Sequence, residues 1–118
     1  MGIYIGNSTN PVTVEFVGGS VSTEAYLGLT DSYGPIIKKG DNYVCKVGVE
    51  GWLSKALKDA GERSVQIKGF SIVEISFTNT EFVTALGTDS IFSFFLGKLI
   101  PQLGVLIPAW AGKLIADF

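Results

Sequence analysis

The sequence predicts an α+β protein: a small antiparallel β-sheet or β-sandwich with one short crossover helix and an apolar C-terminal helical segment. Three observations support this fold class. Apolar and polar residues alternate in several segments up to Phe77, which is the period-two pattern of half-buried strands. Residues 52–60 switch to helical spacing, and residues 90–116 are almost free of charge.

The size and composition predict one folded domain. The chain has 118 residues, of which 47% are hydrophobic and 17% charged, so it can bury a core that a disordered chain cannot. We divide it into a β-rich domain at 1–88 and an apolar helical tail at 89–118. This division still allows a single folding unit.

The first strands are predicted at the N-terminal end. Ile3 and Ile5 alternate with Tyr4, and the same alternation returns over 12–16 after the turn-forming residues 7–11. We expect an opening hairpin with a long loop. A further extended segment is predicted at 21–29, before a turn at 31–35.

The clearest strand begins at Asn42. Tyr43, Cys45, Val47 and Val49 share one face, which is the expected core face. Cys45 is the single cysteine of the chain, so it cannot form an intrachain disulfide. Its inward position predicts a buried structural thiol that resists thiol reagents in the native state.

Residues 52–60 predict the crossover helix. Leu53, Ala56 and Leu57 lie on one side of a helix here, and Gly61 follows at the position that commonly ends a helix.

Residues 63–78 predict one or two further strands, with Gly69 at a bulge or bend. Glu74 falls on the same face as Ser76, so we expect that face to be solvated. The segment 82–86 fits either an extended or a helical structure, and the composition changes at Gly87 and Thr88.

The tail carries little charge. Residues 1–88 hold 16 of the 20 charged residues, whereas Lys98 and Lys113 are the only ones between Ser90 and Ala116. Thr88 or Asp89 is a fair N-cap for a helix that runs to about Ile100. Pro101 then predicts a helix break or a helical hairpin.

A short pattern recurs in the tail and places glycine at Gly97, Gly104 and Gly112. If the tail stayed helical past its prolines, these glycines would form one small-residue stripe, along which another helix could approach closely. The alternative is a tail that is buried against the sheet, with glycine making room for bulky neighbours.

Burial against the sheet would still leave apolar surface exposed, because a tail that is apolar on all its faces cannot pack all of them against one small sheet. The prolines and lysines make a plain transmembrane anchor doubtful, and re-entrant or interfacial insertion fits better, with lysines reaching headgroups and Trp110 at the interface. The residues expected to contact a membrane or another subunit are Phe94, Phe95, Gly97, Lys98, Leu99, Gly104, Leu106, Trp110, Gly112 and Lys113.

The sequence offers no predicted catalytic, cofactor-binding or metal-binding residue. Histidine is absent, which excludes histidine-dependent triads, and the carboxylates are scattered singly. Neither phosphate-binding glycine motif occurs, and cations are not clustered as nucleic-acid binding requires. The tyrosines and tryptophans suit a sugar or lipid-headgroup site as well as a core, so they assign no ligand pocket.

Two functions follow from the tail. In the first, a non-enzymatic membrane-active protein inserts it into a bilayer, to attach or to form a pore; a β domain with one insertable helix is similar in architecture to some small cytolysins. In the second, a structural protein self-assembles through it into an oligomer, filament or inclusion. The expected partners are thus membrane lipid, further copies of the chain, or both.

The start of the sequence predicts where the protein acts. Residues 1–6 hold no basic and apolar leader. We therefore expect a cytoplasmic protein or one released without a classical signal, and membrane association is compatible with either.

Overall fold

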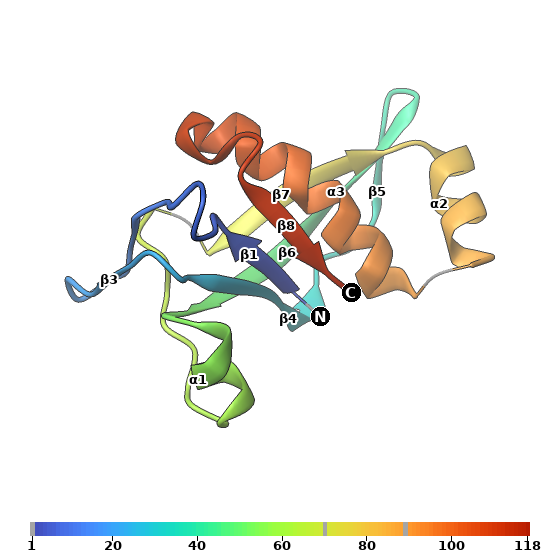
Figure 1. Cartoon of the computed structure of the whole chain (residues 1–118). Helices are drawn as coiled ribbons and strands as arrows, with labels where there is room; N and C mark the ends of the chain where they lie inside the picture. The colour runs from blue at the N-terminus through green and yellow to red at the C-terminus, as the bar shows by residue number, and fades with distance from the viewer. Residues whose placement is uncertain (1, 70, 89) are drawn as a thin grey trace.

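The computed structural model describes residues 2–69, 71–88 and 90–118. The α+β class is confirmed. Within these residues, a curled six-stranded antiparallel sheet forms a half-barrel, and three α-helices accompany it, including one of 16 residues near the C-terminus (Figure 1).

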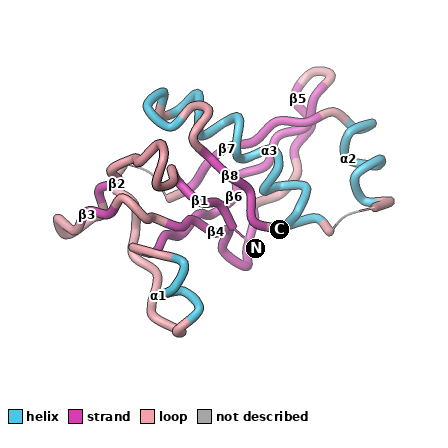
Figure 2. The backbone as a smooth tube through the Cα atoms, in the orientation of Figure 1, coloured by secondary structure: helices cyan, strands magenta, loops and turns pink. Residues whose placement is uncertain are grey.

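The sheet joins strands that lie far apart in the sequence. Its path is β5-β6-β4-β1-β8, and β7 pairs with β6. The strands are β1 (Gly2–Ile5), β4 (Tyr26–Tyr33), β5 (Ile37–Lys39), β6 (Asn42–Trp52), β7 (Ile72–Phe77) and β8 (Leu114–Asp117). A separate two-stranded ribbon of β2 (Val14–Glu15) and β3 (Val21–Ser22) projects beside the sheet (Figure 2).

Each of the three described α-helices begins at a side-chain cap. Ser54 accepts a hydrogen bond from the Leu57 N–H at the start of α1 (Lys55–Asp59), and Ser90 caps α3 (Ile91–Leu106) in the same way. α2 (Asn79–Leu86) begins with a reciprocal capping box between Thr78 and Glu81. A short 3₁₀ helix, η1 (Pro108–Trp110), follows α3.

The expected opening hairpin is wrong. β1 lies between β4 and β8, with Ile3 opposite both Leu27 and Ala116, while Val14 pairs with Ser22 in the ribbon. Both buried isoleucines do face the core. Alternation reports the face that a side chain occupies, but it does not name the strand that pairs with it.

The helix at 52–60 exists as α1, but it is not a crossover. β6 and β7 are antiparallel neighbours, so α1 is an excursion between adjacent strands (Figure 1). None of its residues is buried. The segment 63–78 forms β7 and two isolated bridges at Val65 and Ile67; the expected strand position of Phe70 lies outside the described residues.

The predicted faces of the two clearest strands are confirmed. Cys45, Val47 and Val49 are buried on the inner face of β6, and Glu74 and Ser76 are exposed on β7. The segment left open between extended and helical structure is helical, as α2.

The tail departs from the predicted helix in three ways. α3 begins after Ser90 and continues through Pro101 to Leu106, so there is no hairpin at that proline. The chain then turns through η1. Finally, Leu114–Asp117 form a strand rather than a helix and complete the sheet beside β1. Asp89, one of the two expected caps, lies outside the described residues.

α3 fills the open side of the half-barrel, where it contacts β7, β8 and β1 (Figure 1). Its buried side chains are Phe94, Phe95, Leu96, Leu99 and Leu103. They belong to the same core cluster as Ile3, Val47 and Val73 of the sheet. Burying a side chain of this size contributes about 1.5–3 kcal/mol, so α3 is a main source of the stability of the sheet.

Candidate functional site

The structure divides the predicted contact residues between core and surface. Phe94, Phe95 and Leu99 lie in the core, and Trp110 is also buried. In this conformation they support the fold and do not form a contact surface. Leu106 is half exposed and Lys113 is exposed.

Lys98 is engaged within the molecule. Its ammonium group forms an ion pair with the carboxylate of Glu81, which also belongs to the capping box of α2. The pair joins α2 to α3. If Lys98 is to contact lipid headgroups, as the sequence predicts, its ion pair with Glu81 must first break.

The three glycines do not form a stripe. Gly97 faces open space on α3, whereas a Cβ at Gly104 would lie 3.4 Å from the Cα of Ala111. Gly112 has a φ of +75° in the turn before β8. The packing-stripe hypothesis fails because it required one continuous helix, and the helix ends at Leu106.

The last turn of α3, η1 and the following turn leave a surface that we call the apolar end. It consists of Val105, Leu106, Pro108, Ala109 and Ala111, all of them exposed. Val105 is 72% exposed and Leu106 50% exposed. The nearest charged residues along the chain are Lys98 and Lys113, so the segment between them offers only uncharged groups to solvent.

Buried neighbours fix the shape of the apolar end. Leu103 and Trp110 lie in the core on either side of it. The Ile107 N–H donates to the Leu103 carbonyl at 2.8 Å, and the Lys113 N–H donates to the Trp110 carbonyl at 2.9 Å. The exposed apolar residues thus lie on a short turn that backbone hydrogen bonds stabilise. None of the helices in the described part of the chain has the length and apolar character to cross a membrane.

A second cluster lies on the outer face of the sheet, where neighbouring strands bring aromatic residues together. The Tyr26 ring lies 5.1 Å from the Tyr4 ring and 6.5 Å from the Trp52 ring, between centroids. α1 places two ammonium groups over these rings. That of Lys58 is 5.0 Å from the Tyr26 centroid, and that of Lys55 is 5.7 Å from the Tyr4 centroid.

Asp117 of β8 ties this cluster together. The Tyr26 hydroxyl donates to its carboxylate at 2.8 Å, and the Lys55 ammonium lies 2.9 Å from the same oxygen. Hydrogen bonds from Lys55 and Tyr26 hold the pKa of Asp117 below its ordinary value. Burial, followed by the bond to Asp117, raises the pKa of Tyr26, so the phenol stays protonated and donates.

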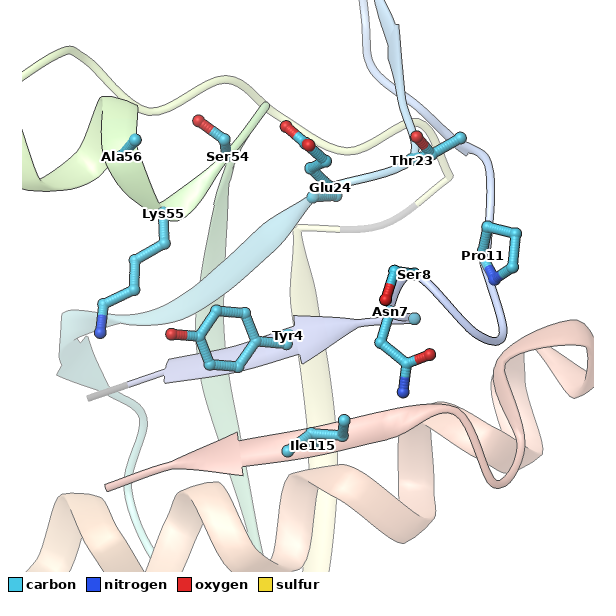
Figure 3. A pocket seen from close by; sticks show the side chains of 12 residues that line it. Tyr4, Asn7, Ser8, Pro11, Thr23, Glu24, Ser54, Lys55, Ala56 and Ile115 are labelled. Carbon is cyan, nitrogen blue, oxygen red and sulfur yellow. The ribbon is translucent and has the colours of Figure 1, made fainter.

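A cleft of about 810 Å³ opens beside this cluster (Figure 3). Its lining includes Tyr4, Asn7, Glu24, Ser54, Lys55 and Ile115. Tyr4 and Ile115 are opposite residues of β1 and β8, which places an aromatic and an aliphatic side chain on the cleft floor. The polar side chains come from the loop after β1, the segment before β4 and the start of α1.

Cys45 is placed as expected. Its side chain is 1% exposed, and its thiol donates to the Gly34 carbonyl at 3.4 Å. Burial raises the pKa of this thiol, which keeps it in the unreactive protonated form. Among the described residues, no three metal-binding side chains gather closely enough to hold an ion.

The described residues thus form an α+β half-barrel with an apolar end and a cleft whose floor is formed by Tyr4 and Ile115. No family model, curated protein or solved structure matches the chain.

The sequence did not predict the cleft, and it did not predict which residues form the apolar end. The cleft joins residues as distant as Tyr4 and Ile115, and no local pattern signals that juxtaposition. The apolar end had a usable signal in the uncharged segment between Lys98 and Lys113. That signal located the surface, but Leu106 is the one member of the apolar end among the predicted contact residues.

Proposed function

We propose that this is a non-enzymatic, membrane-active protein that attaches to a lipid surface through its apolar end. The observation that carries the proposal is the exposure of Val105 and Leu106 on an uncharged segment where α3 ends. Exposing such an apolar surface to water is unfavourable in free energy. The boundary between lipid headgroups and acyl chains can bury it. Lys113 stands next to this surface, where an ammonium group can reach lipid phosphate.

Attachment of this kind leaves α3 in place. Withdrawing the helix from the half-barrel would expose the five side chains that it buries, each at a cost of about 1.5–3 kcal/mol. Shallow insertion of the apolar end avoids that cost. A pore would need further rearrangement and is an extension of the proposal rather than its first step.

Flotation with vesicles tests attachment. Val105→Asp and Leu106→Asp together should abolish flotation with phosphatidylcholine vesicles, because charged side chains resist entry into the interfacial layer. Both positions are exposed, so the fold should persist, as circular dichroism can check. Val83→Asp is the matched control, since Val83 is 62% exposed on α2, away from the apolar end. Wild-type protein that stays at the bottom of the gradient would refute the proposal.

Self-assembly is the second candidate, and β8 favours it. β8 ends the path of the sheet and pairs with β1 alone among the described strands. Ile115 is 45% exposed on β8, and Phe118 just beyond is 71% exposed. An edge strand with apolar side chains suits association with another copy.

Light scattering after size exclusion, without lipid, separates the two candidates. Assembly that Ile115→Lys abolishes and the double aspartate variant leaves intact would favour association through β8. A monomer that floats with vesicles would favour attachment. A full-length chain that remains monomeric at high concentration and ignores vesicles would exclude both.

A further inference from the structure

We propose that the cleft beside Tyr4 binds a neutral saccharide. The inference goes beyond membrane attachment, because it concerns a different surface and a soluble ligand. It stands on the lining of the cleft, its balance of charge and its size.

The floor of the cleft suits the apolar face of a sugar ring. Figure 3 shows the Tyr4 ring nearly face-on, with Lys55 on one side, Asn7 on the other and Ile115 below. The C–H groups on one face of a pyranose carry slight positive charge and pack against the negative face of an aromatic ring. The exposed part of Ile115 extends this apolar floor.

The rim supplies the mixed hydrogen bonding that sugar hydroxyls require, since each hydroxyl both donates and accepts. The Asn7 side-chain oxygen is used in its own turn, accepting from the Thr9 N–H at 2.9 Å and the Asn10 N–H at 2.7 Å. This leaves the Asn7 amide N–H groups to donate. The Glu24 carboxylate accepts, and the Ser54 hydroxyl can donate while its oxygen caps α1.

The charges of the cleft argue against the two charged alternatives. An anion such as phosphate would meet Glu24, and Lys55 is already paired with Asp117 at 2.9 Å. A quaternary ammonium group would need the face of Tyr4, but the Lys55 ammonium lies 5.7 Å from the centre of that ring and repels a second cation. A neutral ligand avoids both conflicts.

The size is adequate. The cleft of about 810 Å³ lies within the range of roughly 300–1,000 Å³ that is usual for small-ligand sites. It can hold one or two sugar rings.

An NMR titration of the labelled full-length protein tests the proposal. The probes are oligosaccharides of glucose, galactose, mannose and N-acetylglucosamine, with inorganic phosphate and choline as charged comparisons. At least one sugar should give saturable shifts centred on Tyr4, Asn7 and Ile115. Shifts at the cleft from phosphate or choline but from no sugar, or from none of the probes, would overturn it.

Two pairs of variants link binding to the cleft. Tyr4→Ala should weaken binding roughly tenfold by removing the stacking face, whereas Tyr4→Phe keeps the ring and should stay within about threefold. Asn7→Asp keeps the oxygen that holds the turn and removes the amide donor, so it should also weaken binding. Asn10→Asp introduces the same charge in the same loop, outside the cleft lining, and should bind like the wild type.

The second pair keeps the test valid if Tyr4→Ala fails to fold. Equal affinities for the Asn7 and Asn10 variants would exclude Asn7 as a ligand-binding residue and overturn the proposed rim. Because the sugars are soluble and the vesicles of the flotation assay contain none, failure here leaves membrane attachment untouched.

Discussion

Two glycines in the C-terminal region have different backbone conformations and different surroundings. Gly97 lies in the middle of α3, and a Cβ there would meet no atom within 4 Å. Gly112 adopts a φ of +75°, which other residues reach only with strain. The similarity of the surrounding sequences hides this difference, because the repeat continues where the backbone changes from helix to turn.

We therefore expect opposite effects from one substitution. Gly97→Ala should raise the free energy of unfolding by about 1 kcal/mol, because alanine loses less backbone freedom in a helix. Gly112→Ala should lower it by about 1–2 kcal/mol through the positive φ. Urea denaturation measures both. A loss of stability on Gly97→Ala would show that this face of α3 is closely packed, contrary to the structure.

Single residues were also where the sequence predicted most reliably. The inward face of Cys45 and the outward face of Glu74 follow from alternation, which depends only on the local pleat. Trp110 could not be placed in this way. Its burial depends on the reversal of the chain after α3, and no short periodicity encodes that reversal.

At the scale of elements, β8 shows why strand partners are harder to predict than strands. Its sequence, Leu114–Asp117, resembles the preceding helical segments, and its strand conformation depends on the open side of β1. α2, by contrast, carried a local signal: Thr78 and Glu81 have the spacing of a capping box. That spacing favours a helix over the segment at 82–86, where periodicity alone fits either structure.

Asp117 makes the attachment of β8 depend on pH. Its folded-state pKa lies below the ordinary value of 3.8, so the ionised carboxylate contributes stability above that pH. This contribution is lost as the pH falls through the folded-state pKa. Asp117→Asn should therefore be less stable than the wild type at pH 7, and the difference should shrink below about pH 4.

Urea unfolding at a series of pH values between neutral and acid checks this expectation. Asp41→Asn, in the turn between β5 and β6, removes an exposed carboxylate elsewhere and should follow the wild type. A stability difference for Asp117→Asn that stayed constant into acid would show that the carboxylate does not hold β8 through its charge.

For the whole molecule, the sequence predicted the α+β fold class, but it did not predict that α3 completes the core of the half-barrel. The uncharged tail suggested a separable helix, yet Phe95, Leu96 and Leu103 share one core with the sheet. The surplus of apolar surface expected from composition does exist, at Val105 and Leu106. Which side chains stay outside is decided by the curvature of the half-barrel, a property of all its strands together.

Removal of residues 89–118 should consequently unfold the protein. The truncated chain loses the buried face of α3 and the strand that pairs with β1. We expect the loss of dispersed NMR signals and of cooperative thermal unfolding. Deletion of Phe118 alone, which is 71% exposed, is the control and should leave the fold intact. A truncated protein that still unfolds cooperatively would mean that the sheet is stable without α3.

The pairing of β1 with β8 also governs the order in which the molecule can be completed during its synthesis. Gly2 stands opposite Asp117, so β1, which is made before the other described strands, pairs with β8, which is made after them. Until then, one edge of β1 offers unpaired backbone groups to any neighbouring chain. A nascent chain in which β8 has not yet been made should thus be prone to associate with others, because the half-barrel closes only once β8 is available to pair with β1.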